Sequence, residues 1–194
     1  MNKKELIVLV ILLIAITTRF LFIQSGQSAI PGFTAVGAMM ILAATYMTGW
    51  KRWMVPLGIF WVSDMIMNNV VYAQYYDSFQ VIGSLWIYGA FFGIGLMAFF
   101  LMKKPSVLRL LATSTLAAVI FFLVTNFGSW LHPAAPYAKD ISGLMASYEA
   151  GIPFFRNGLV GDVLFSFVLF GAFDLIATRV SSLDPVIFFR KSLA

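Results

Sequence analysis

The chain has 194 residues, of which 61% are hydrophobic and only 11% are charged. A water-soluble domain carries roughly 25% charged residues, so this composition excludes an ordinary soluble protein and predicts a single membrane domain in a lipid bilayer. The net charge of +5 is explained by cationic loops on the cytoplasmic side of a membrane, and no nucleic-acid partner is expected.

Six apolar segments are predicted to form transmembrane helices, since a helix needs about 20 residues to cross the hydrocarbon core. The first follows Met1-Asn2-Lys3-Lys4 and lacks a small-residue cleavage site after its apolar core, so we predict a retained helix and not a signal peptide. The second is short, because Pro31-Gly32 and Gly49 bracket it. The predicted class is an all-α polytopic bundle with helices at residues 6–23, 34–49, 53–72, 79–102, 106–131 and 158–178.

Lysine and arginine divide unequally between the two sides of this bundle. Only Arg19, Lys139 and Arg156 fall on one side. An excess of basic residues marks the cytoplasmic side, so both termini are predicted to be cytoplasmic, as an even number of spans also requires. The ten basic residues on that side are Lys3, Lys4, Lys51, Arg52, Lys103, Lys104, Arg109, Arg179, Arg190 and Lys191.

The connection at residues 132–157 is predicted to lie outside the cell and to carry a short amphipathic lid helix at about residues 140–150. Asp140 can cap this helix, and Gly151 and Pro153 are expected to end it. Such a helix would lie across the outer mouth of the bundle, either over a site or as an interfacial anchor. Its apolar residues recur at helical spacing: Ile141, Leu144, Met145 and Tyr148.

Polar side chains on the first and third predicted helices reach the outer half of the bundle. At 1.5 Å per residue, Asp64 lies about 16 Å above the start of its helix, and Asn68 at i+4 and Trp61 at i−3 share its face. Arg19 lies about 20 Å along the first helix. These two helices therefore bring charged and amide groups to a similar depth.

The fifth and sixth predicted helices add polar groups at the same level. Asn126 lies near the outer end of the fifth helix with Trp130 at i+4. Asp162 is about one turn inside the sixth helix, just after Arg156 and Asn157 in the loop. Because four helices converge in this way, we predict a substrate site lined or braced by Arg19, Trp61, Asp64, Asn68, Asn126, Trp130, Arg156, Asn157 and Asp162.

The charged candidates also have a purely structural interpretation. A charge inside a membrane costs at least ~2.5 kcal/mol on insertion scales, so it is normally paired or faces water. Arg19 with Asp64 and Arg156 with Asp162 are the sensible pairs, and each could serve only to tie the bundle together. Arg19 could instead reach lipid phosphates, and tryptophan and tyrosine at these depths also form interfacial belts.

Catalysis has little support, and no enzyme, cofactor or metal site is predicted. The chain has a single histidine, His132, and no cysteine, which leaves no usual zinc ligand set. A hydrolytic set of Ser129, His132 and Asp140 is the form that an intramembrane enzyme would take. A further alternative is an ion- or proton-coupled carrier or channel in which Asp64 and Asp162 titrate.

Several motifs resemble those of a known family. They are residues 125–130 (Thr-Asn-Phe-Gly-Ser-Trp), residues 150–157 (Ala-Gly-Ile-Pro-Phe-Phe-Arg-Asn), Gly161-Asp162, residues 33–38 and Ser63-Asp64. The chain resembles a family of bacterial six-helix membrane proteins, which usually have asparagine at the position of Gly32. That family is similar in architecture to the S-components of energy-coupling-factor (ECF) vitamin transporters, with the solitary cobalamin-type components among the nearest in shape.

This resemblance implies a function and a location. An ECF S-component-like bundle in the bacterial inner membrane would bind a vitamin-like molecule, such as cobalamin or a related corrinoid, below its external loops and release it inside. The cysteine that some cobalamin-type components place on cobalt has no counterpart here. S-components dock an ECF-type coupling subunit, with its ATPases, through an Ala-xxx-Ala surface on helix one, where this chain offers only Ala15.

Overall fold

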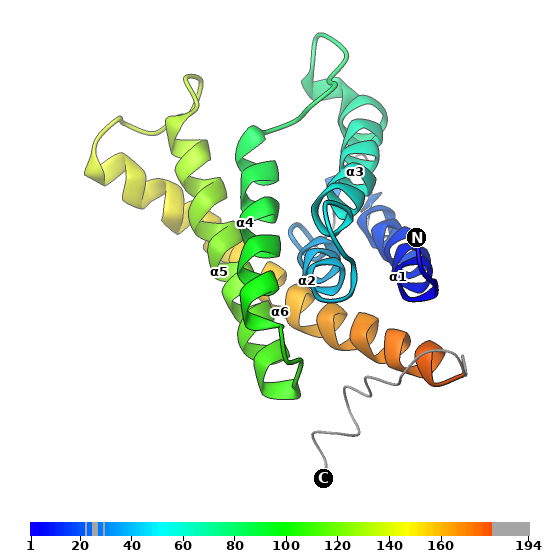
Figure 1. Ribbon diagram of the computed structural model, residues 1–194. Helices are drawn as coiled ribbons and strands as arrows, with labels where there is room; N and C mark the ends of the chain where they lie inside the picture. The colour runs from blue at the N-terminus through cyan, green and yellow to red at the C-terminus, as the bar shows by residue number, and fades with distance from the viewer. Residues whose placement is uncertain (22, 25–26, 29, 180–194) are drawn as a thin grey trace.

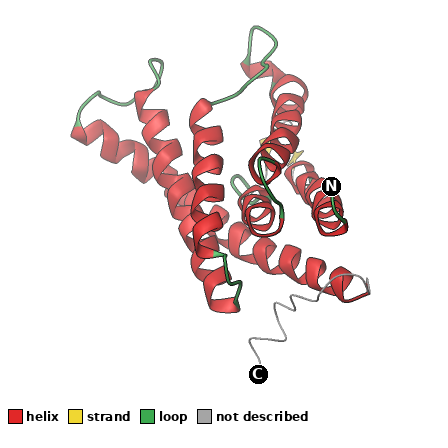
Figure 2. Cartoon of the chain, viewed as in Figure 1, coloured by secondary structure: helices red, strands yellow, loops and turns green. Residues whose placement is uncertain are grey.

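The computed structural model describes residues 1–21, 23–24, 27–28 and 30–179. The regular secondary structure within these residues is helical, apart from a two-residue antiparallel ladder of β1 (Ile23–Gln24) with β2 (Gln27–Ser28), and loops join the elements (Figure 2). The predicted all-α class is therefore confirmed. The helices are α1 (Lys3–Ala15), η1 (Ile16–Phe20), α2 (Val36–Tyr46), α3 (Lys51–Ile66), η2 (Met67–Val71), η3 (Ala73–Tyr75), α4 (Leu85–Leu101), α5 (Val107–Leu131) and α6 (Ile141–Arg179).

Helix α2 is the centre of the molecule. It packs against all five other α-helices, with α1 and α3 on one side and α4 and α5 on the other (Figure 1). It carries no charged residue, and every residue from 36 to 44 is buried. A helix that is apolar on all sides is stable only when it is surrounded, which explains its place. At 11 residues it is about 16 Å long, well short of a membrane thickness.

Three of the expected apolar segments are long and apolar enough to cross a membrane. They are Lys51–Val71, which joins α3 and η2, the whole of α5 at Val107–Leu131, and α6 at Ile141–Arg179. Helices α2 and α4 are apolar but shorter. Each of the six expected segments overlaps a helix, and the described residues form a helical bundle with three potential membrane-spanning helices.

The expected lid helix does not end at Gly151 and Pro153, and this prediction is wrong. Residues 141–179 form one 39-residue helix, α6, which crosses behind α5 and α4 in Figure 1. Gly151 is a packing residue, because a Cβ there would lie 2.3 Å from Oδ1 of Asn126. Pro153 lies inside this helix and is exposed, and its missing N–H leaves one carbonyl of the preceding turn without its helical hydrogen bond. Asp140 caps the helix as expected, accepting from the Gly143 N–H at 2.8 Å.

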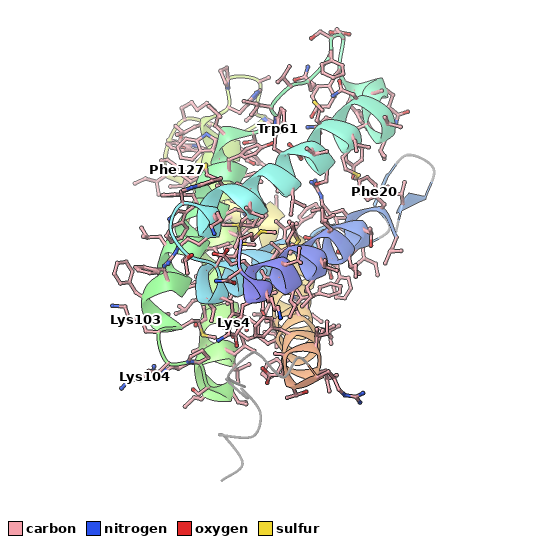
Figure 3. All side chains as sticks on the ribbon, turned by 45° about the vertical axis from the view of Figure 1, so that its right-hand side comes forward. Lys4, Phe20, Trp61, Lys103, Lys104 and Phe127 are labelled. Atoms are coloured by element: carbon pink, nitrogen blue, oxygen red, sulfur yellow. The ribbon has the colours of Figure 1, made fainter. Side chains whose placement is uncertain are left out.

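Basic residues gather at one end of the bundle. The Arg52 guanidinium at the start of α3 lies 4.5 Å from the Phe99 ring of α4, and the Lys103 ammonium lies 5.9 Å from the same ring. Lys4, Lys103 and Lys104 all lie below Trp61 and Phe127 in Figure 3. This basic end is the one predicted to be cytoplasmic; Arg190 and Lys191 lie outside the described residues.

A buried carboxylate, Glu5, joins two segments at the basic end, and it was not identified from the sequence. Glu5 is only 1% exposed and forms an ion pair with Lys51. Its Oε1 accepts from the Thr48 hydroxyl at 2.7 Å, and its Oε2 accepts from the Asn2 N–H at 3.1 Å. The Lys51 ammonium and the Thr48 hydroxyl lower the pKa of Glu5 to about 2. The first turn of α1 is thereby joined to the turn between α2 and α3.

Candidate functional site

A half-enclosed cavity of about 480 Å³ lies between the helices, away from the basic end. Its wall is mostly apolar and includes six phenylalanines from α3, α4, α5 and α6. Small-molecule sites measure ~300–1,000 Å³, so this cavity has the volume of a site for a compact ligand. The lining residues are Arg19, Pro31, Gly32, Thr34, Val36, Gly37, Phe60, Met67, Tyr72, Ile87, Phe91, Ala118, Phe121, Phe122, Thr125, Asn126, Ser129, Tyr137, Ala150, Gly151, Phe154, Phe155, Gly158 and Asp162.

The phenylalanines form two contacting groups on the cavity wall. Phe91 of α4 packs against Phe60 of α3 at 4.8 Å and against Phe121 of α5 at 5.0 Å between ring centroids. Phe122 of α5 packs against Phe155 of α6 at 5.0 Å. Edge-to-face and tilted pairs of this kind hold each ring in one orientation. The wall is therefore built from rings whose positions are fixed by one another.

Arg19 lies in the cavity wall and forms an ion pair with Asp64. Its Nη2 lies 3.1 Å from Oδ1 of Asp64, as expected, and its Nη1 donates to the Ser63 hydroxyl at 2.8 Å. Asp64 Oδ2 accepts from Asn68 Nδ2 at 3.3 Å and from the Tyr88 hydroxyl at 3.1 Å. Asp64 and Asn68 thus stand behind Arg19 and do not line the cavity themselves. Asp64 neutralises the guanidinium, and Asn68 donates to Asp64 and helps to hold that carboxylate in place.

Asp162 reaches the cavity without a partner. Only 8% of the residue is exposed, and it makes no hydrogen bond or ion pair within the described residues. The carboxylate stands against the backbone of α2 at Gly37, where a Cβ would lie 2.2 Å from Oδ1. Glycine at this position is what allows a carboxylate to fit between α2 and α6. Asp162 is therefore a buried acid that lines the cavity beside Gly37.

The expected pair of Arg156 with Asp162 does not form, and this prediction is wrong. Both residues belong to the continuous helix α6, six positions apart. At 100° per residue they point about 120° apart, and they are separated by about 9 Å along the axis. Arg156 is exposed, away from the buried carboxylate. The pairing was expected because the sequence suggested a loop at residue 156.

Asn126 lines the cavity from α5. Its Nδ2 donates to the Phe122 carbonyl one turn earlier, at 2.8 Å, which leaves Oδ1 without a hydrogen bond in the described residues. Gly151 of α6 lies directly against this amide. Beside it, the Ser147 hydroxyl donates to the Asn126 carbonyl at 2.9 Å. Asn126 therefore combines a tie between α5 and α6 with a free acceptor at the cavity.

The remaining predicted residues brace the connections around the site and do not line it. Trp61 Nε1 donates to the Val81 carbonyl, and Trp130 Nε1 donates to the Ala138 carbonyl, both at 2.8 Å. Asn157 Nδ2 donates to the Pro31 carbonyl at 3.0 Å. Of the nine predicted residues, Arg19, Asn126 and Asp162 line the cavity.

The aromatic wall and Tyr88 were missed by the sequence reasoning. With 20 phenylalanines in the chain, composition alone does not separate a cavity ring from a lipid-facing one. A signal did exist at Phe60, which lies one turn before Asp64 on the same helix face. Its ring lies 4.7 Å from the Arg19 guanidinium, a cation–π contact.

The residues of the hydrolytic alternative are occupied elsewhere. Asp140 Oδ1 accepts from the Ser142 hydroxyl and the Gly143 N–H, and these contacts hold the pKa of Asp140 below its ordinary value. His132 Nδ1 accepts from the Ala134 N–H at 3.2 Å. A triad histidine instead donates from Nδ1 to its acid. Ser129 lines the cavity, and the hydrogen bond that joins it to His132 in the described residues is a backbone one, from the His132 N–H to the Ser129 carbonyl at 3.3 Å, which does not involve the Ser129 hydroxyl or the imidazole.

The chain belongs to DUF6580, a family of unknown function, whose match covers residues 1–183. No curated protein and no solved structure shows significant similarity to the chain. The family match extends over all six α-helices and thus includes the whole cavity.

Proposed function

We propose that this member of DUF6580 is a multi-pass protein of the bacterial inner membrane that binds a vitamin-like small molecule in its cavity and delivers it into the cell, in the manner of an ECF S-component. The observation that carries the proposal is the cavity itself. It lies away from the basic end, has the volume of a small-molecule site, and is lined by a buried acid, Asp162, that has no partner among the described residues. A bundle that served only as a scaffold would have no use for such a space.

The volume of the cavity limits the size of the ligand that it can hold. A volume of about 480 Å³ suits a compact molecule with one or two rings, whereas a corrinoid with its nucleotide loop would extend well beyond it. The proposed ligand is therefore smaller than cobalamin. Uptake also needs an energy source, and an ECF-type coupling subunit with its ATPases would have to dock without an Ala-xxx-Ala surface on α1, which contains only Ala15.

Co-purification of small molecules tests the binding function directly. The protein is purified in mild detergent and its bound small molecules are identified by mass spectrometry, in parallel for the wild type and two glycine variants. Gly158→Phe places a ring in the cavity, because Gly158 lines it and a Cβ there meets no atom closer than 3.7 Å. Gly89→Phe is the matched control, since a Cβ there meets nothing within 4 Å and Gly89 is outside the cavity.

The expected result is a molecule retained by the wild type and by Gly89→Phe but lost from Gly158→Phe. Equal recovery from all three proteins, or no molecule from any, would rule out a binding site in this cavity.

The proposed orientation is testable because the chain contains no cysteine. Single cysteines are introduced as Lys104→Cys at the basic end and Ala134→Cys in the connection between α5 and α6. A membrane-impermeant maleimide should label residue 134 on intact cells and residue 104 only after lysis. Labelling of both residues on intact cells would contradict the proposed topology.

An ion- or proton-coupled carrier is the second candidate, and Asp162 favours it. A buried carboxylate without a partner is the kind of group on which coupling ions bind in membrane proteins. In liposomes, this function predicts cation-dependent flux that disappears in Asp162→Asn. A binding component instead shows saturable binding without flux when it is reconstituted alone.

A further inference from the structure

The charges around the cavity do not balance, and the imbalance indicates the class of ligand. Among the lining residues only Arg19 and Asp162 are of types that ordinarily carry a full charge at neutral pH. Arg19 is already paired with Asp64 at 3.1 Å, so its charge is compensated inside the protein. Asp162 has no such partner in the described residues. When Asp162 is ionised, the cavity and its supporting ion pair therefore carry one net negative charge.

The position of Asp162 is built into the packing. Only 8% of Asp162 is exposed, and its carboxylate fits only because α2 has glycine at residue 37. A buried carboxylate is normally paired, because leaving an unpaired charge in an apolar environment is costly. Asn126 offers an acceptor at the same cavity, and an acceptor cannot satisfy a carboxylate. The missing partner is therefore a donor or a cation.

The rest of the wall indicates what kind of cation fits. Phe91, Phe121, Phe122 and Phe155 present ring faces and edges that suit a flat apolar body. Aromatic rings also attract organic cations, whereas a hydrated metal ion would need several oxygen ligands. No group of three acidic or histidine side chains suited to a metal ion occurs in the described residues.

We infer that the ligand is an aromatic organic cation, whose positive group pairs with Asp162 while its ring packs against the phenylalanine wall. Asn126 Oδ1 accepts a second hydrogen bond from the same molecule. This inference rests on the proposed binding function and names the substrate class of that site. It also assigns Arg19 a passive role, since its charge is held by Asp64.

Three indoles that differ in charge but share one ring system test the inference. Tryptamine is cationic, indole-3-ethanol is neutral and indole-3-propionate is anionic at neutral pH. Their dissociation constants for the purified protein are measured by ligand-observed NMR in detergent. We expect tryptamine to bind at least tenfold more tightly than the other two, and this preference is read from the wild type without any variant.

Two carboxylate variants then locate the source of the preference. Asp162→Asn keeps the shape of the side chain and should abolish the tenfold advantage of tryptamine. Asp77→Asn removes an exposed carboxylate outside the cavity and should preserve it. Equal dissociation constants for the three indoles in the wild type, or no binding of any of them, would overturn the inference. An unchanged preference for tryptamine in Asp162→Asn would also overturn it. The co-purification experiment decides the binding function separately, because a neutral or anionic molecule found there would refute only the charge assignment.

Discussion

Removing the charge of Arg19 should destabilise the protein strongly, and removing Asp64 at the same time should restore much of the loss. The pair is poorly exposed, with 13% of the Arg19 side chain and 8% of the Asp64 side chain accessible. In Arg19→Gln, Asp64 is left as a buried carboxylate without its cation. In the double variant Arg19→Gln with Asp64→Asn, neither member of this pair leaves an unpaired charge.

The magnitude follows from the geometry of the pair. At 3.1 Å and an effective dielectric constant near 20, the attraction is about 5 kcal/mol before desolvation is counted. Breaking a buried pair costs about 3–5 kcal/mol. Asp64 keeps hydrogen bonds from Asn68 and Tyr88 in the variant, so the lower end of about 3 kcal/mol applies to Arg19→Gln. We expect the two single changes to be coupled by about 2 kcal/mol or more.

The assay is reversible unfolding in mixed micelles, with the free energy of unfolding measured for the wild type, both single variants and the double variant. Arg109→Gln is the control, because its exposed guanidinium bonds only the Lys104 carbonyl and its loss should change the free energy by less than about 0.5 kcal/mol. Additive effects of the two single changes would refute the reasoning, since they would mean that Arg19 and Asp64 do not stabilise each other.

Two further predictions concern packing and pH. Gly37→Ala should destabilise the protein and weaken ligand binding, because the new Cβ would lie 2.2 Å from Asp162 Oδ1. Gly58→Ala is the control, because a Cβ there meets nothing within 4 Å, and it should be neutral or stabilising by up to about 1 kcal/mol. Measured free energies of unfolding that rank the two variants in the opposite order would contradict this prediction. The pKa of Glu5 is lowered from 4.5 to about 2, first of all by Lys51, so its stabilising effect is complete above pH 4.5 and is lost as the pH falls toward 2. In Glu5→Gln, the free energy of unfolding should depend less on pH between 4.5 and about 2 than it does in the wild type. The same pH dependence in both proteins would show that the carboxylate is not ionised in the folded protein.

Helix positions were predictable where one strong local signal agreed with the packing. Helix α5 was expected at residues 106–131 and occupies Val107–Leu131, because Ser106 caps the Arg109 N–H and Pro133 follows its end. Helix α4 begins at Leu85, six residues later than expected. The apolar residues before it are held in an extended connection by Asn69, which donates to and accepts from the backbone of Gln80. Hydropathy carries no information about such a long-range side-chain contact.

The site was predictable in its polar groups and not in its shape. Depth along the helices correctly brought Arg19 together with Asp64, and it placed Asn126 and Asp162 near one level. It could not assign which polar groups face the cavity, because that depends on helix rotation and on where α6 begins. Reading Gly151 as a stop signal moved the start of the last helix and produced a false partner for Asp162.

Glycine explains both this error and the arrangement of the site. Asp162 faces Gly37, Asn126 faces Gly151 and Asp64 faces Gly83, and in each case a Cβ on the glycine would lie 2.8 Å or less from a side-chain oxygen. Each of these three polar groups thus occupies the space of a side chain missing from the facing segment. Glycine is therefore needed at these three positions because a polar side chain lies against them, and not because of a left-handed backbone conformation, which none of the three has. At Gly37, Gly83 and Gly151, where no turn requires glycine, the missing side chain makes room for a polar group from a facing segment.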